Sequence, residues 1–264
     1  NELLMEYSIY DALKSGCSKI VILSNQECIS ILETRLSYLH SKIELIFVDQ
    51  FTYDPNYPKY RKRPWGTAHA VFSCAEFINK PFLVINADDF YGGNSYKKAQ
   101  KLIEITKGTQ HAMIGFKLGN TLSEFGGVSR GLCDTSNKTL VSIIELTNIQ
   151  IKNNEITCSQ NTDGLNNNLL VSMNLWVFNP LIFPLLRDAF ETFYSENKKD
   201  ENAELYLPYV INQLIQNGEI SVTMADTDSS WFGLTFAEDL TPSVKKLKSL
   251  ISQGLYPFKL TTDG

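Results

Sequence analysis

Short apolar runs alternate with amphipathic stretches along most of this sequence. The amphipathic stretches repeat their apolar residues at the spacing of a helix, and the shorter runs have the length of buried strands. Strands that alternate with helices favour a parallel sheet covered on both faces. Strands are expected at residues 19–23, 43–48, 82–85, 110–116, 169–178 and 220–224, and helices at residues 4–15, 26–39, 66–77, 94–106, 180–195, 205–216 and 236–253.

Residues 124–158 depart from this alternation. Antiparallel strands are expected at residues 126–131 and 140–146, and a shorter pair at residues 149–151 and 156–158 flanks the turn Asn153-Asn154. This segment should add a small antiparallel β element to a single domain that spans residues 1–264, since α/β folds of this length often form one domain.

The stretch Pro81 to Gly93, with the sequence PFLVINADDFYGG, carries the candidate chemistry. Its apolar run predicts a strand buried on both faces, in the middle of the sheet. Asp88 and Asp89 follow at the carboxyl end of this strand, where open α/β sheets bind their ligands. Paired carboxylates suit Mg²⁺ or Mn²⁺, which bridge protein carboxylates and substrate phosphates. The alternative is a structural turn in which Asp89 caps the next helix.

The composition narrows the class of protein. With 24 basic and 29 acidic residues the formal charge is −5, and a mildly acidic chain lacks the cationic field that nonspecific nucleic-acid binding needs. No apolar run reaches the length of a membrane span, and the printed sequence does not start with the pattern of a signal peptide. Its five scattered cysteines form no Cys-x-x-Cys pair. We therefore expect a cytoplasmic protein with reduced thiols, and the apolar helix stripes are compatible with a homo-oligomer.

Residues 49–65 are rich in tyrosine, proline and basic residues, and they precede the expected helix that opens at Gly66-Thr67. Loops at the carboxyl ends of strands collect binding residues, and a basic loop beside an acidic site suits a phosphorylated ligand. A glycine at a helix start lets a ligand approach the backbone and its free N–H groups. A solvated loop is the alternative interpretation.

Four motifs in a fixed order connect this chain to a known family. They are RPWGTAHAV, INADDFYGG, SMNLWVF and WFGLTFAEDL. Together they resemble the sugar-1-phosphate nucleotidyltransferases, the pyrophosphorylase group, and within it an NDP-sugar pyrophosphorylase-like bacterial branch. The resemblance covers nearly the whole chain. It implies a Rossmann-like, three-layer α/β fold of the GT-A type with a mixed, mainly parallel central sheet. Residues 1–123 would bind the nucleotide and residues 124–264 the sugar.

The resemblance also implies roles for individual residues. The positions that match are Asp88 for catalysis and for Mg²⁺ (or Mn²⁺), Gln50, Gly66, Thr67 and Asp89 for the nucleotide, and Glu145 and Asn174 for the sugar. Asn174 also stands out on its own, because it interrupts a long apolar strand. A buried amide needs several hydrogen-bond partners, which either a local group or a sugar could supply.

Three departures from the family pattern affect these expectations. Leu146 stands where the family carries a lysine after the sugar-binding glutamate, which leaves one sugar-phosphate contact unassigned. The later metal-binding aspartate belongs near Trp231, where the sequence offers Asp226 or Asp228, and Asp228 is our candidate. The family's first strand and its glycine-rich phosphate loop have no counterpart before Asn1, so we expect a piece of a longer polypeptide that is impaired in the printed form.

The expected reaction transfers a nucleoside monophosphate from an NTP to a sugar 1-phosphate, forming an NDP-sugar and pyrophosphate. The attacking phosphate oxygen is already ionised at neutral pH, so the reaction needs alignment and charge neutralisation rather than a base. Two alternatives stay open. A metal-dependent GT-A-type glycosyltransferase would form no pyrophosphate, and a noncatalytic nucleotide or sugar sensor would lack the phosphate loop.

Overall fold

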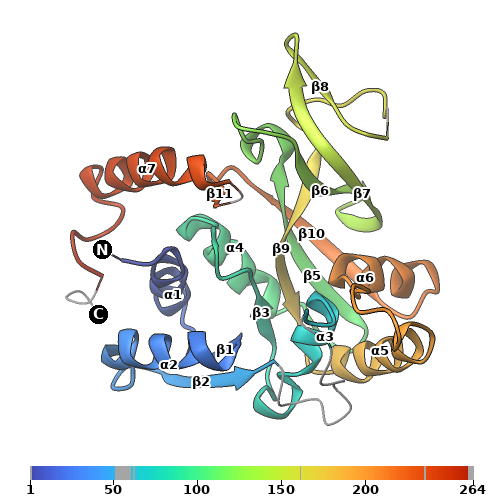
Figure 1. Ribbon diagram of the computed structural model, residues 1–264, viewed down its shortest axis with the longest axis horizontal. Helices are drawn as coiled ribbons and strands as arrows, with labels where there is room; N and C mark the ends of the chain where they lie inside the picture. The colour runs from blue at the N-terminus through green and yellow to red at the C-terminus, as the bar shows by residue number, and fades with distance from the viewer. Residues whose placement is uncertain (1, 51–60, 62, 161, 235, 261–264) are drawn as a thin grey trace.

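A seven-stranded mixed sheet lies between two layers of helices in the computed structural model, which describes residues 2–50, 61, 63–160, 162–234 and 236–260 (Figure 1). The helices are α1 (Leu4–Lys14), α2 (Gln26–Arg35), α3 (Thr67–Phe72), α4 (Gly93–Ile103), α5 (Ile182–Asn197), α6 (Leu207–Gln216) and α7 (Leu240–Ser252). The strands are β1 (Lys19–Ser24), β2 (Glu44–Asp49), β3 (Phe82–Val84), β4 (Asp89–Phe90), β5 (Gln110–Lys117), β6 (Val128–Ser136), β7 (Thr139–Lys152), β8 (Glu155–Thr157), β9 (Leu170–Phe178), β10 (Ser221–Thr227) and β11 (Phe232–Gly233).

Two apolar clusters hold the layers together. Along β5, Met113 faces one cluster, while Ala112 and Ile114 face the other, as the alternation of side chains along a strand requires. The first cluster packs α3, α5 and α6 against the sheet, and the second packs α4 against its opposite face. This packing of helices on both faces of the sheet confirms the three-layer α/β prediction.

None of the helices in the described parts of the chain has the length and apolar character needed to cross a bilayer.

The sheet is mixed, as expected, but its balance of directions differs from the prediction. Its strands follow the order β10-β5-β9-β6-β7-β8, with β3 paired to β9. In this sheet the pair β5–β10 is parallel, and the other described pairings are antiparallel. The strands β1 and β2 form a separate parallel pair. An apolar run in the sequence indicates that a segment is buried. It does not indicate the direction of the strand relative to its neighbours, because that depends on which distant segment pairs with it.

The strand β3 was expected in the middle of the sheet and buried on both faces, and the structure differs. Among the described residues it pairs with β9 alone, and its three residues are only partly buried. The expected strands 140–146 and 149–151 are likewise one continuous strand, β7, which passes through Asn148 in a left-handed backbone conformation (φ +54°). An asparagine tolerates this conformation, so the ladder continues where a break was expected.

A third apolar cluster joins α1 to the C-terminal segment, and a buried acid is hydrogen-bonded to one of its members. The side chain of Asp11 on α1 is 6% exposed, and Tyr256 donates a hydrogen bond of 2.6 Å to its Oδ2 atom. Burial raises the pKa of Asp11 from its usual 3.8 to about 6. The folded state therefore binds this proton more tightly than the unfolded chain does, and stability is lost as the pH rises from about 4 to about 6.

Replacing Asp11 by asparagine should remove this pH dependence. Asparagine cannot ionise but still accepts the hydrogen bond from Tyr256. Relative to the natural protein, the variant is expected to gain roughly 1–3 kcal/mol of unfolding free energy near pH 7, and the difference should shrink toward about pH 4. Urea unfolding of both proteins across this range measures the effect. A difference that is constant with pH would contradict the assignment.

Candidate active site

A cavity of about 240 Å³ opens where the turn before β4, the pair β6–β7, the strand β9 and Trp231 come together. Its lining combines segments that lie far apart in the sequence. The lining residues are Asn86, Asp88, Asp89, Ser129, Arg130, Gly131, Glu145, Ser172, Met173, Asn174, Pro208 and Trp231. Four residues predicted from the sequence, Asp88, Asp89, Glu145 and Asn174, thus share one cavity.

One side of the cavity is a row of three paired residues across the sheet. Gly131 on β6 is paired with Glu145 on β7 and with Ser172 on β9. Residues paired in this way present their side chains on the same face of the sheet. A Cβ atom placed on Gly131 would lie 2.8 Å from Ile143 Cγ2, 3.5 Å from Ser172 Cβ and 3.7 Å from Glu145 Oε2. A side chain at this position would therefore press on Ile143 and come into contact with Glu145 and Ser172.

The acidic turn that follows β3 contributes two carboxylates with different surroundings. Asp88 is exposed, whereas Asp89 is 6% exposed and accepts a hydrogen bond of 2.9 Å from the Asn86 amide. The Tyr91 hydroxyl accepts from the Asn86 N–H and lies 3.2 Å from Asp89 Oδ2. Burial, with a further contribution from the Asp88 charge, raises the pKa of Asp89 to about 7. These contacts hold the Asp89 carboxyl group in place, and both Asp88 and Asp89 line the cavity.

Asn174 is directed into the cavity by an irregularity of β9. The register between β5 and β9 shifts between Met113 and Gly115, and Asn174 has a φ of +59°. A bulge of this kind turns a side chain away from the regular alternation of the strand. The Asn174 amide lies 3.4 Å from Asn86 Oδ1, and its oxygen accepts from the Trp176 indole at 3.3 Å. Local partners thus hold the amide without enclosing it, since it also lines the cavity.

Arg130 is the cationic member of the described lining residues. Its side chain is 8% exposed, and its guanidinium lies 4.7 Å from the centre of the Trp231 ring. It donates hydrogen bonds to the carbonyl oxygens of Ser129 (2.7 Å) and Thr121 (2.5 Å). Burial lowers the pKa of Arg130 to about 10, and Asp89 and then Glu145 oppose this shift. The residue is therefore cationic at neutral pH within a mostly acidic cavity.

Comparison with known proteins identifies the family. A family model described as nucleotidyl transferase matches residues 1–249. The chain belongs to the nucleotidyl transferase family. Membership confirms the predicted family and an enzyme that transfers nucleoside monophosphates in general. No functionally curated protein sequence matches this nucleotidyl transferase.

Two solved structures share the fold of this nucleotidyl transferase. A protein of Bacillus anthracis described as a candidate glucose-1-phosphate thymidylyltransferase, in complex with sucrose, is 13% identical with a TM-score of 0.61, covering 98% of this chain and 85% of that one. The CTP:phosphocholine cytidylyltransferase of Streptococcus pneumoniae is 14% identical with a TM-score of 0.58, covering 92% of this chain and 85% of that one. At these identities the likeness shows the fold.

The carboxylates of this nucleotidyl transferase fit a divalent cation that also binds substrate. Among the described residues no group of three or more histidine, cysteine, aspartate or glutamate side chains could enclose a metal ion. Mg²⁺ does not require such a group, because it typically binds one or two carboxylates and completes its shell with water and substrate phosphates. Asp88 and Asp89, adjacent on one turn and both at the cavity, match this arrangement.

Asp228, the predicted second metal ligand, has different surroundings. It follows β10, is largely exposed, and pairs with Lys117 at 2.8 Å, which lowers the pKa of its carboxyl group. It is not among the residues that line the cavity. A metal-binding role for Asp228 therefore stays a prediction, and the structure offers Asp89 as the carboxylate beside Asp88.

Gly233, in the motif after Trp231, packs closely against the acidic turn. The strand β11 pairs with β4, which brings Gly233 opposite Asp89. A Cβ atom on Gly233 would overlap Asp89 Oδ1. Replacing Gly233 by alanine is therefore expected to displace the Asp89 carboxylate and lower kcat by about tenfold or more. Steady-state kinetics test this, with Ser230→Ala, an exposed neighbour, as the control. Unchanged kinetics in the Gly233 variant would contradict the packing argument.

Of the predicted nucleotide-binding positions, Asp89 lines this cavity, whereas Gln50, Gly66 and Thr67 do not. The Gln50 N–H donates to Ser24 O at 3.0 Å, directly after β2. Gly66 has a φ of +97°, and a Cβ atom there would lie 2.5 Å from Leu205 O. The Thr67 hydroxyl accepts a hydrogen bond of 2.8 Å from the Leu207 N–H. In this structure the close approach that the glycine permits is made by the Leu205 backbone. The nucleotide-binding role of these positions stays a prediction.

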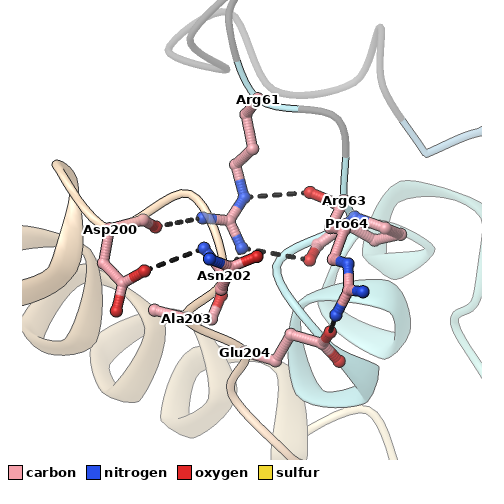
Figure 2. Close-up of polar contacts among 7 residues, drawn as sticks. All are labelled: Arg61, Arg63, Pro64, Asp200, Asn202, Ala203 and Glu204. Atoms are coloured by element: carbon pink, nitrogen blue, oxygen red, sulfur yellow. Dashed lines mark hydrogen bonds and ion pairs between the residues drawn. The ribbon is translucent and has the colours of Figure 1, made fainter.

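The basic stretch before Gly66 is only partly described, because residues 51–60 and 62 lie outside the described residues. Its Arg61 has a structural setting, as Figure 2 shows. The guanidinium donates to the carbonyl oxygens of Arg63 (2.9 Å), Asp200 (2.6 Å), Pro64 (3.2 Å) and Ala203. It also lies 3.5 Å from the centre of the Trp65 ring. Arg61 thus links the segment before α3 to the segment before α6 through hydrogen bonds. Its guanidinium is used in these contacts and is not exposed for binding a ligand.

Several cavity residues were missed by sequence reasoning. Arg130 and Gly131 were assigned to a strand without a role, although an arginine at an inward-facing strand position is an unusual placement. Ser172 lies within a motif that drew attention to Asn174 only. Their positions become informative once the pairing of β6 with β7 and β9 is known.

Proposed function

We propose that this protein transfers a nucleoside monophosphate from an NTP to a sugar 1-phosphate, releasing pyrophosphate and forming an NDP-sugar. The observation that carries the proposal is the meeting of Asp88, Asp89, Glu145 and Asn174, from three distant segments of the chain, in one cavity. Family membership supports nucleotidyl transfer in general. The acidic turn comes from residues 1–123 and most of the other lining residues from 124–264, which agrees with the proposed nucleotide and sugar halves.

The lining supports a hydroxyl-rich acceptor. Glu145, Asn174 and Ser172 present carboxylate, amide and hydroxyl groups to one space, and such groups exchange hydrogen bonds with sugar hydroxyls. A quaternary ammonium group, as in phosphocholine, is typically recognised by several aromatic rings. Trp231 is the aromatic residue among the described lining residues, and the Arg130 guanidinium already lies over its ring. A sugar phosphate therefore suits this cavity better than phosphocholine.

The chain's own residues would orient and neutralise the reactants. The acceptor phosphate oxygen forms the new bond to the NTP α-phosphorus, and the bond from that phosphorus to the pyrophosphate oxygen breaks with its electron pair leaving on pyrophosphate. A divalent cation held by Asp88 and Asp89 would supply positive charge to the phosphates. Glu145 lies at the cavity wall, where burial raises its pKa and Arg130 lowers it. In this role it would accept hydrogen bonds from the sugar.

A pyrophosphate-release screen of the full-length protein tests the proposal. The four common NTPs and dTTP are each combined with a set of sugar 1-phosphates, with phosphocholine and with no acceptor, in the presence of Mg²⁺. Acceptor-dependent pyrophosphate release with a sugar 1-phosphate is the expected result. Release with phosphocholine alone would overturn the sugar assignment. Transfer of a sugar from an NDP-sugar without pyrophosphate would favour the glycosyltransferase alternative, and binding without turnover would favour the sensor.

A further inference from the structure

The Arg130 side chain has an unsatisfied hydrogen-bonding group at the cavity wall. Two of its nitrogens donate to backbone carbonyl oxygens, but the buried Nε atom has no hydrogen-bond partner. Among the described residues no carboxylate forms an ion pair with it, although Asp89 and Glu145 both act on its charge. A buried charge without an ion-pair partner is costly, and an unsatisfied donor beside it adds to the cost. This placement is difficult to explain by packing alone.

The charges around the cavity indicate what would complete this environment. Its described lining residues include three carboxylates, on Asp88, Asp89 and Glu145, and one guanidinium. Carboxylates repel a phosphate monoester. Its binding in such a space therefore needs a basic side chain of the protein, in addition to the divalent cation that accompanies the nucleotide. The planar guanidinium matches phosphate oxygens through two parallel N–H donors, and at a partly dehydrated site such charge-assisted bonds are strong.

We propose that Arg130 binds the phosphate group of the acceptor and thereby makes the cavity selective for phosphorylated over unphosphorylated sugars. This inference rests on the proposed function, and it assigns a residue to the phosphate contact left open by Leu146. Arg130 is paired with Leu146 in the register of β6 and β7. Leu146 is 2% exposed and packs in the apolar cluster beneath the sheet. By this pairing the Arg130 side chain shares the face of Leu146 and of Trp231, which belong to the same cluster, and Arg130 and Trp231 reach the cavity lining from that face.

Binding measurements test the proposal without depending on turnover. The probes are glucose 1-phosphate, glucose and inorganic phosphate, titrated calorimetrically into the full-length protein. The natural protein should bind glucose 1-phosphate at least about tenfold more tightly than glucose. Arg130→Met should bring this ratio close to one, mainly by weakening glucose 1-phosphate, and Arg130→Lys should restore part of it. Arg187→Met, which removes an exposed arginine on α5, should leave the ratio unchanged. A ratio unaffected in Arg130→Met would overturn the proposal.

A second measurement covers the case in which the Arg130 variants fail to fold. Because the guanidinium lies over the Trp231 ring, inorganic phosphate that binds to it should change the indole emission of the natural protein. Trp231→Phe should abolish this response while the other two tryptophans stay in place. If phosphate at saturating concentration leaves the emission unchanged, or if Trp231→Phe retains the response, the assignment to Arg130 is wrong.

The outcome for Arg130 is separable from the outcome for the proposed function. Pyrophosphate release that continues in Arg130→Met with an unchanged KM for the sugar phosphate would leave the function standing and remove Arg130 from it. Loss of phosphate selectivity in Arg130→Met, in a protein that releases no pyrophosphate with any pair of substrates, would support the phosphate site and overturn the proposed reaction.

Discussion

Replacing Asp88 by alanine is expected to lower kcat for pyrophosphate release at least about a hundredfold. Asp88 is the exposed member of the acidic pair at the cavity, where it can bind a divalent cation together with the substrate phosphates. Its removal takes one charged ligand from a site with few protein ligands. In phosphoryl transfer most of the rate enhancement comes from charge neutralisation and alignment, so the loss should appear in kcat more than in the KM for the sugar phosphate.

Three variants make this prediction specific. Asp88→Asn keeps the size of the side chain but removes its charge, so it should resemble the alanine variant if charge is what matters. Asp134→Ala removes an exposed carboxylate on β6 outside the cavity and should keep natural activity. Asp228→Ala decides between the two candidates for the second ligand, because only a metal ligand should alter the Mg²⁺ concentration needed for half-maximal activity. Natural kcat in Asp88→Ala would exclude Asp88 from the mechanism.

Replacing Arg61 by alanine is expected to lower the free energy of unfolding by about 2–4 kcal/mol. Arg61 is 4% exposed, and its guanidinium donates to carbonyl oxygens on both of the segments that it joins (Figure 2). The guanidinium also lies over the Trp65 ring. Removing it leaves those carbonyl groups without their charged donor and opens a space beside the indole ring. Chemical denaturation followed by tryptophan fluorescence measures the loss, because Trp65 lies next to the missing side chain.

The neighbouring Arg63 provides a matched control for Arg61. Its side chain is 65% exposed and lies 3.9 Å from the Glu204 carboxylate. An exposed pair of this kind contributes little, so Arg63→Ala should cost about 1 kcal/mol or less. Arg61→Lys keeps a positive charge but cannot donate in a planar fork to both segments, and it should behave more like Arg61→Ala. Equal, small losses in the Arg61 and Arg63 variants would show that the contacts in Figure 2 do not stabilise the fold.

The link between Arg61 and the backbone of residues 200–203 also bears on the predicted nucleotide site. It positions the segment that continues into Gly66, whose backbone is packed against Leu205. A loss of nucleotide affinity in Arg61→Ala would therefore reflect displacement of Gly66 and Thr67, and not loss of a direct phosphate contact. The sequence favoured the direct contact because a basic stretch beside an acidic motif suits phosphate, but composition does not reveal which arginine is already occupied by carbonyl groups.

Local pattern alone determined the layered α/β arrangement and the acidic turn. An apolar run followed by Asp88 and Asp89 is enough to predict a strand with carboxylates at its end, because burial and turn formation depend on neighbouring residues. The polar Asn174 within an apolar strand was informative for the same reason, since a buried amide requires partners. Such features depend on consecutive residues, so they can be predicted without knowing which distant segments pack against them.

Tertiary structure alone decided how the cavity is built. The row of Glu145, Gly131 and Ser172 follows from the register of three strands, and a shift of one residue would turn each side chain to the other face of the sheet. The placement of Arg130 over Trp231, and the pairing of Asp228 with Lys117 away from the cavity, likewise join residues separated by about a hundred positions. Register and long-range packing depend on the fit of whole elements, which no single stretch of sequence specifies.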